Sequence, residues 1–260
     1  MTIRIGFPGA TGRISQLCQE ASAAAGFLIS GGTVRANSTR TPPQGIEILP
    51  DVRALADVSD VIVDFTHADT VEAHADALKG TSCAWVLGTS GVTPTGKAAI
   101  ERIAKEVPVF YAANFSRGMN VVLLLAERLA QALPAESYDA EIVDIFHRNK
   151  VDAPSGTAIA LGEAVARGRG RNLADVMVAG REGDIGARKP DEIGFSSLRG
   201  GSVAGENQLI ITGPADQTSL AHRVSNPRVY AKGALQAAQW VVGKPAGLYS
   251  MKDMLLELNR

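Results

Sequence analysis

The stretch IRIGFPGATGRI, residues 3–14, decides the fold of this 260-residue chain. Apolar residues at positions 3, 5 and 7 alternate as in a strand, glycines follow, and residues 15–25 are rich in helix formers. Gly6, Gly9 and Gly12 therefore fit a GxxGxxG variant of the dinucleotide-binding fingerprint. Such glycines let backbone N–H groups approach a pyrophosphate at the positive end of the helix. The pattern predicts a cofactor loop, with an ordinary turn as the alternative.

The rest of the N-terminal half continues the alternation of strands and helices. Four further apolar runs are separated by alanine-rich helical stretches, and they cover residues 26–34, 61–65, 83–87 and 107–112. This order predicts an α/β domain of Rossmann type, a parallel sheet with helices on both faces.

After Asn114 the pattern changes to that of a smaller α+β domain. A helix is expected over residues 121–133, a strand over 140–146 and a helix from near Thr157. Shorter runs over 194–213, with turns at 199–201 and 205–207, suit an open mixed sheet. The apolar helix expected over 231–242 can return to the first domain.

The end of the second predicted strand bears on the choice of cofactor. Sites that prefer NAD usually carry Asp or Glu about 20 residues after the glycine loop, to bind the ribose 2′-hydroxyl. Here Thr33, Val34 and Arg35 offer no carboxylate but a guanidinium, which can pair with a 2′-phosphate and stack on adenine. We therefore expect NADPH in preference to NADH, which stays possible. Arg13 is a second candidate phosphate partner, and an exposed Arg35 without a role is the alternative.

A dense motif, HRNKVDAPSGTA, occupies residues 147–158. Ser155, Gly156 and Thr157 precede an alanine-rich helix, whose free N–H groups and dipole can hold a carboxylate, and Lys150 adds a full charge. The alternative is a helix cap with solvated neighbours, which is favoured for Ser155 taken alone.

The motif resembles the signature of the dihydrodipicolinate (4-hydroxy-tetrahydrodipicolinate) reductase family, approximately E-x-H-H-x-x-K-x-D-x-P-S-G-T-A. Lys150 through Ala158 match it without a gap. Further family motifs recur in order: GATGRI at 9–14, DFT at 64–66, GTSG at 88–91, AANFSRGMNV at 112–121, REGDIGAR at 181–188, EIGFSSLRGG at 192–201 and GLYSM at 247–251.

The resemblance implies an NAD(P)H-dependent oxidoreductase that reduces a cyclic unsaturated imine dicarboxylate in lysine and diaminopimelate biosynthesis. It implies a dinucleotide-binding domain over 1–113 and 222–260, a substrate-binding and tetramerisation domain over 114–221, and a homotetramer. His147 and Lys150 would be catalytic. The substrate would be held by His147, Lys150, Ser155, Gly156 and Thr157. The cofactor would be bound by Gly6, Gly9, Ala10, Thr11, Gly12, Arg13, Ile14, Arg35, Phe65, Thr66, Gly88, Thr89, Ala112, Asn114 and Phe115.

The sequence departs from the family pattern around the expected acid. The first histidine of the pair, usually assigned as the acid, is Phe146, which cannot donate a proton. The acidic residue before it is shortened to Asp144, Asn207 follows Gly-Glu where the family has His, and Glu-Leu-Thr-His reads SLAH at 219–222. Two alternatives stay open: a paralogue that reduces another carboxylated imine or related substrate, and a non-catalytic NADPH-binding regulatory protein. Lys150 and the intact Ser-Gly-Thr loop argue against the second.

Composition restricts the partners. With 26 basic and 27 acidic residues the net charge is −1, so we expect no nucleic-acid or membrane partner. The N-terminus has no secretory pattern, which predicts a cytoplasmic protein. Cys18 and Cys83 are expected in the core, and no metal site is expected. His67 and His74 are interpreted as surface or cap residues.

Overall fold

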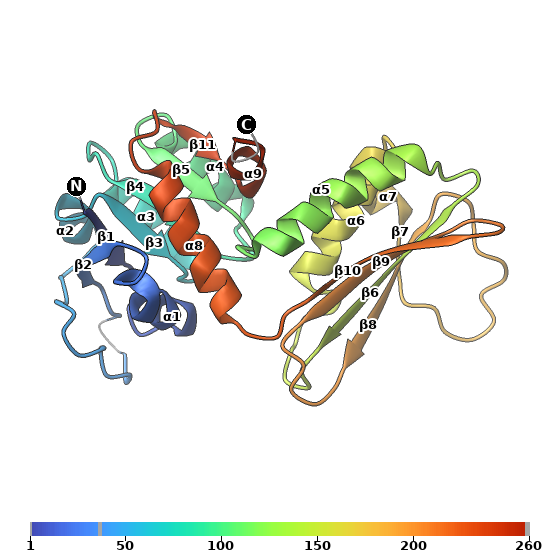
Figure 1. Ribbon diagram of the computed structural model, residues 1–260, viewed down its shortest axis with the longest axis horizontal. Coiled ribbons are helices and arrows are strands. Elements are labelled where there is room, and N and C mark those ends of the chain that lie inside the picture. The colour runs from blue at the N-terminus through green and yellow to red at the C-terminus, as the bar shows by residue number, and fades with distance from the viewer. Residues whose placement is uncertain (1, 36–37, 258–260) are drawn as a thin grey trace. The chain divides into compact units, whose positions relative to one another are not determined.

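The computed structural model describes residues 2–35 and 38–257, in two compact units (Figure 1). The first unit comprises Met1–Arg117 with Pro227–Arg260, and the second comprises Gly118–Asn226. The boundaries expected from the sequence lie at 113/114 and 221/222. Each unit has its own sheet. The first has an apolar core on each face of its sheet, and the second has a core of its own.

The sheet of the first unit has six parallel strands in the order β11-β5-β4-β3-β1-β2. They are β1 (Ile3–Phe7), β2 (Phe27–Gly32), β3 (Val61–Asp64), β4 (Ala84–Leu87), β5 (Pro108–Tyr111) and β11 (Gly247–Tyr249). The parallel sheet predicted from the alternating pattern is confirmed. The chain runs from β1 outward to β2 and then returns to β3 on the other side of β1, so the strand order reverses at β1.

Helices cover both faces of this sheet because its strands alternate between two apolar cores. Val61 and Val63 belong to the core with α1 (Arg13–Ser22), α8 (Arg228–Val241) and α9 (Met251–Glu257). Ile62 belongs to the core with α2 (Val52–Asp57), α3 (Val71–Ala77) and α4 (Pro94–Ile103). A 3-10 turn, η1 (Ala68–Thr70), precedes α3.

The C-terminal segment joins the first unit. Helix α8 packs beside α1 (Figure 1), and β11 adds an edge strand by pairing Leu248 with Val109 of β5. The sequence pattern predicts the helix but not β11, because three residues are too short to show a period.

The second unit contains the mixed sheet that the sequence predicts, and its strands have the order β10-β9-β6-β8-β7. Its strands are β6 (Asp139–Phe146), β7 (Met177–Ala179), β8 (Ile193–Arg199), β9 (Glu206–Thr212) and β10 (Gln217–Arg223). Strands β6 and β8 are parallel, whereas β6–β9 and β9–β10 are antiparallel. Helices α5 (Arg117–Ala132) and α6 (Gly156–Gly168) pack on one face, and α7 (Leu173–Val176) follows α6.

The turn expected at 205–207 is wrong for two of its three residues. Glu206 and Asn207 begin β9, and Asn207 pairs with Asp144 of β6. Gly205 alone has the special backbone, with φ +154°, and a Cβ there would lie 2.7 Å from the ring of Phe146. The tertiary contact with Phe146 therefore requires the glycine, and the strand begins directly after it.

Candidate functional site

The glycine loop lies between β1 and α1, as the fingerprint predicts. Gly9 has φ +64°, and Gly12 is the N-cap of α1 with no side-chain capping bond. Thr33, directly after β2, holds the loop: its carbonyl accepts from Ala10 N at 2.9 Å, and its hydroxyl accepts from Gly9 N at 3.4 Å. The N–H groups of the first helical turn therefore stay available for an anion.

Ser15 provides a test of whether this loop fits a pyrophosphate. Its side chain is buried, and its hydroxyl oxygen has no hydrogen-bond partner among the described residues. A Cβ placed on Gly12 would lie 3.5 Å from that oxygen, so the hydroxyl is beside the loop. A buried hydroxyl without a partner is costly, and a phosphate oxygen would satisfy it. The glycine loop and Ser15 therefore fit a pyrophosphate. Sequence reasoning missed Ser15 because it read only as a helix residue.

The other predicted cofactor residues gather at the carboxyl ends of β3, β4 and β5. This edge includes the strand-order reversal at β1, where open α/β sheets bind ligands. A Cβ on Gly88 would overlap the ring of Phe65, which makes an edge-to-face contact with Phe115 at 5.4 Å. Thr89 donates to the carbonyl of Thr66 at 3.0 Å. The residues brought together are Phe65, Thr66, Gly88, Thr89, Ala112, Asn114 and Phe115.

Basic side chains accompany the glycine loop. Arg13 opens α1 and Arg35 follows β2, and both are exposed. Arg40 donates to the carbonyl of Thr11 at 3.2 Å, and sequence reasoning missed it inside a polar loop. The loop thus carries three candidate partners for a phosphate.

In the second unit, Ser155 is the N-cap of α6. Its hydroxyl accepts from Ala158 N at 3.1 Å and donates to Asn207 Oδ1 at 3.2 Å, and its backbone N donates to Asp144 Oδ2 at 2.8 Å. Gly156 is exposed, and a Cβ there would meet nothing within 4 Å. The Ser155 side chain is therefore a structural cap, while the backbone of Gly156 stays accessible at the positive end of the helix.

Two cations lie against the ring of Phe146. Lys150 Nζ is 4.7 Å from the ring centroid and bonds both oxygens of Asp152, at 2.7 and 2.9 Å. The Arg199 guanidinium is 5.6 Å from the centroid and bonds both oxygens of Asp144, at 3.2 and 3.3 Å. His147 is half-buried at the end of β6, where its carbonyl accepts from Lys150 N.

Asp144 is buried beneath this cluster. Burial alone would raise its pKa, but hydrogen bonds from Arg199, Ser197 and Ser155 outweigh it and hold the pKa below its usual value. Asp144 is therefore an ionised support for Arg199 and for the start of α6.

The structure also shows the surroundings of the two cysteines and of two histidines in the first unit. Cys18 and Cys83 are buried free thiols, as predicted, and burial raises the pKa of each to about 12. His67 is exposed at the N-cap of η1. His74 is not a surface residue: it bonds the buried Asp64 at 2.7 Å, which no helical pattern in the sequence reveals. Within residues 2–35 and 38–257, no group of three or more His, Cys, Asp or Glu side chains could hold a metal ion.

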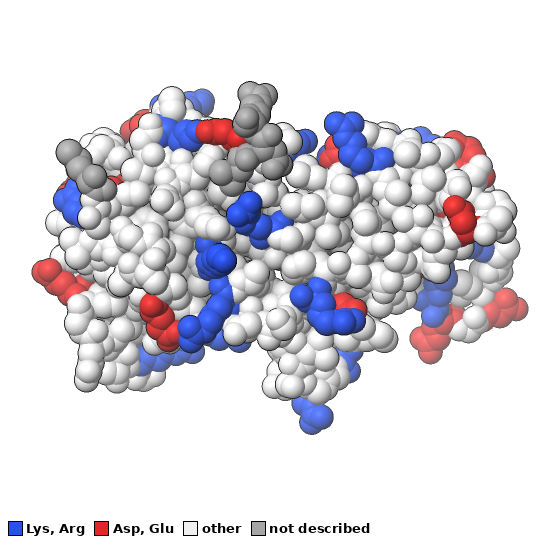
Figure 2. All heavy atoms as spheres, viewed as in Figure 1, with Lys and Arg blue, Asp and Glu red and all other residues white. Residues whose placement is uncertain are grey.

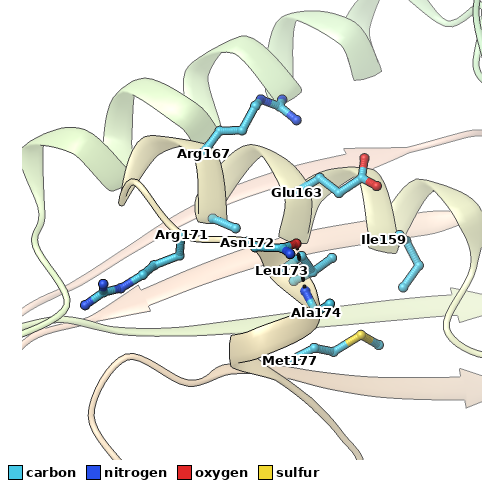
Figure 3. Close-up of a pocket in the computed structure, with 9 residues that line it drawn as sticks. Ile159, Glu163, Arg167, Arg171, Asn172, Leu173, Ala174 and Met177 are labelled. Atoms are coloured by element: carbon cyan, nitrogen blue, oxygen red, sulfur yellow. Dashed lines mark hydrogen bonds between the residues drawn. The ribbon is translucent and has the colours of Figure 1, made fainter.

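A separate pocket of about 380 Å³ lies on the second unit, along α6 and α7 (Figure 3). Ile159 and Glu163 of α6 line it, and so does Asn172, the N-cap of α7, whose side chain accepts a hydrogen bond from Ala174 N at 3.3 Å. None of the predicted site residues lines this pocket.

Charges of both signs are scattered over each unit. On the face shown in Figure 2, Lys and Arg appear in small groups separated by uncharged surface, with Asp and Glu near several of them. No helix of the described chain is long and apolar enough to cross a bilayer.

Fold and site together define the class of nicotinamide-dependent oxidoreductases that carry a separate substrate unit. The family model "Dihydrodipicolinate reductase, N-terminus" matches residues 3–115, and "Dihydrodipicolinate reductase, C-terminus" matches residues 118–255. The chain belongs to the dihydrodipicolinate reductase family, as the motifs predict.

Relatives agree with this membership over nearly the whole chain. The 4-hydroxy-tetrahydrodipicolinate reductase of Granulibacter bethesdensis is 52% identical, over 98% of this chain and 97% of the relative. The enzyme of the same name from Acinetobacter baumannii is 37% identical, over 97% and 96%. A solved dipicolinate-bound dihydrodipicolinate reductase from Paenisporosarcina sp. TG-14 has the same fold, with a TM-score of 0.77 at 19% identity over 96% of this chain and 98% of that one.

Proposed function

We propose that this chain is a 4-hydroxy-tetrahydrodipicolinate reductase of lysine and diaminopimelate biosynthesis. The near full-length relationship to reductases of that name carries the proposal. A non-catalytic regulator would not need both the glycine loop and the anion-binding start of α6. The activity is an NAD(P)H-dependent reduction.

On the cofactor side, the glycine loop and Ser15 would hold the pyrophosphate. The Phe65–Phe115 edge-to-face pair, with Gly88 beneath Phe65, would form the wall for the nicotinamide. When bound, this group supplies the hydride. The protein contributes binding and orientation.

On the substrate side, two carboxylates need two positive features. Lys150 offers an ammonium, and the start of α6 at Gly156, beside Thr157, offers a backbone N–H and the helix dipole. Lys150 forms an ion pair with Asp152, and a substrate carboxylate would replace Asp152 as its partner. His147 and Lys150 would deliver the proton, because Phe146 has none to give.

For the cofactor we propose a preference for NADPH over NADH. Its support is the absence of a carboxylate at residues 33–35 together with the two exposed arginines of this region, Arg13 and Arg35. A guanidinium binds a 2′-phosphate with two parallel bonds and has nothing comparable to bind on a 2′-hydroxyl.

For the assembly we propose a homotetramer built through the sheet of the second unit. The face of that sheet opposite α5 and α6 carries Val143, Ile145, Ile210 and Leu198, with Leu198 52% exposed. The cytoplasmic location and the absence of nucleic-acid and membrane partners stay predictions.

An assay of substrate turnover tests the proposed function. NADPH oxidation is followed while a dihydrodipicolinate synthase generates the substrate in place. We expect turnover by the parent protein and a loss of roughly 10²–10⁴-fold in kcat/KM for Lys150→Ala, which removes a charge and a proton donor. Lys189→Ala, an exposed cation of the same unit, is the control and should match the parent. No NADPH consumption by the parent would overturn the proposal.

A further inference from the structure

A carboxylate is fully buried where β3 ends, directly before the predicted nicotinamide wall. Asp64 is 0% exposed and accepts four hydrogen bonds: from Thr66 N at 2.9 Å, Thr66 Oγ1 at 2.6 Å, His74 Nδ1 at 2.7 Å and Trp85 Nε1 at 3.2 Å. A buried charge is costly unless each lone pair is satisfied. Burial alone would raise the pKa of Asp64, but the hydrogen bonds and charge of His74 and the bonds from Thr66 lower it.

The two oxygens of Asp64 face different elements. Oδ2 accepts from His74 on α3 and from Trp85 on β4, while Oδ1 accepts both donors of Thr66. The carboxylate is thus the link between helix α3 and the loop after β3.

Thr66 in turn touches the other two loops of the cofactor site. Its carbonyl accepts from Thr89 after β4 at 3.0 Å. Its methyl carbon lies where a Cβ on Gly9 would come within 2.8 Å, so it packs directly against the glycine loop. A bond that holds Thr66 in place therefore also helps to position the loop after β4 and the glycine loop.

We propose that His74 is a positioning residue for the dinucleotide, acting through Asp64 on Thr66. The inference rests on the proposed function for the cofactor site itself. His74 lies on α3, outside the loops that would touch the cofactor, and its side chain is 12% exposed. Its Nδ1 lies nearer to Asp64 Oδ2 than Trp85 Nε1 does, at 2.7 Å against 3.2 Å, and it favours the ionised carboxylate.

Loss of the His74 imidazole would change how Asp64 donates and accepts hydrogen bonds. Without the Nδ1 donor, burial favours protonation of Asp64. With the proton on Oδ2, the carboxyl loses acceptor capacity toward Trp85, and Oδ1 no longer carries negative charge, so it accepts more weakly from both donors of Thr66. The bonds that hold the backbone N–H and the hydroxyl of Thr66 then weaken, which loosens both the carbonyl that binds Thr89 and the methyl group that packs on Gly9.

The test compares three variants in cofactor binding without substrate, by fluorescence titration with NADPH. His74→Ala should raise Kd roughly tenfold, the value of a hydrogen bond to a charged group. His74→Asn should bind within about threefold of the parent, because its amide nitrogen occupies the place of Nδ1.

Asp76→Asn is the matched control. Asp76 lies on the same helix as His74, and its substitution weakens exposed ion pairs with Lys79 and Arg102. Asp76 does not face Asp64. The Kd of this variant should equal that of the parent. If His74→Ala does not fold, His74→Gln replaces it, since its amide lies one bond beyond the Nδ1 position, and the same weakening is expected.

Steady-state kinetics separates positioning from general damage. His74→Ala should raise KM for NADPH, while KM for the dicarboxylate and kcat at saturating NADPH stay within about threefold. The inference about His74 is overturned, and the proposed function is not, if His74→Ala binds NADPH as the parent does. The same holds if His74→Asn does not restore the affinity, or if Asp76→Asn weakens binding as much as His74→Ala. A parent that binds neither NADPH nor NADH would overturn the proposed function as well.

Discussion

Phe146 is the residue at which this chain departs most from its family pattern, and the structure gives the phenyl ring a physical role. Its face lies 4.7 Å from Lys150 Nζ and 5.6 Å from the Arg199 guanidinium, so the ring quadrupole stabilises both cations. Its edge packs on Gly205. The ring therefore supports the cations of the site and supplies no proton.

Restoring a histidine at this position tests where the proton comes from. Because we assign proton delivery to His147 and Lys150, Phe146→His should change kcat by less than about tenfold. An aromatic ring is retained for the two cations, so the variant should fold. The measurement is steady-state turnover of both proteins on the same substrate. A gain of roughly a hundredfold or more would mean that the parent pocket has moved to another substrate.

At the scale of elements, the proposed preference for NADPH depends on the junction of the glycine loop with the end of β2. Thr33 binds the loop through both its carbonyl and its hydroxyl, so in the proposed site the residues after it would lie beside the ribose of the dinucleotide. Arg35 is exposed there, whereas Arg40 already binds the Thr11 carbonyl. The two arginines are thus expected to play different parts.

We expect Arg35→Ala to lower the ratio of kcat/KM for NADPH to that for NADH by roughly tenfold or more, since a charge-assisted bond to the 2′-phosphate is lost. Arg40→Ala removes a bond to the loop itself and should weaken both cofactors alike. Kinetics with each cofactor checks both. An unchanged ratio in Arg35→Ala would show that the 2′-phosphate partner is another residue.

At the scale of the whole molecule, the sheet of the second unit has one face covered and one face open. Ile142, Leu209 and Phe195 pack under α5 and α6, while the alternate residues Val143, Ile210 and Leu198 point the other way. A partly apolar face of this kind is typical of a surface that another copy covers.

A charge on the open face should break the proposed tetramer. Leu198→Glu is expected to elute as a smaller species in size-exclusion chromatography with light scattering, because a carboxylate would be buried without a partner. Leu248→Glu, at a leucine 48% exposed in the first unit, is the control and should keep the parent mass. A tetrameric Leu198→Glu protein would place the interface elsewhere.

The sequence by itself determined the class of fold and the family. Hydrophobic alternation, the glycines at 6, 9 and 12, and the cap-and-helix motif at 155–158 are local signals, and local signals survive in a linear pattern. They were sufficient for the parallel sheet, the mixed sheet, the buried cysteines and the two places where ligands are expected.

Only the tertiary structure decided which side chains meet. His74 and Asp64 are ten residues apart, and Phe146 meets Gly205 across the sheet, so neither contact has a period or spacing that a sequence shows. Strand β11 is too short to be seen without its partner β5. Such pairings depend on burial and on strand order, which bring distant residues together only when the whole chain has folded.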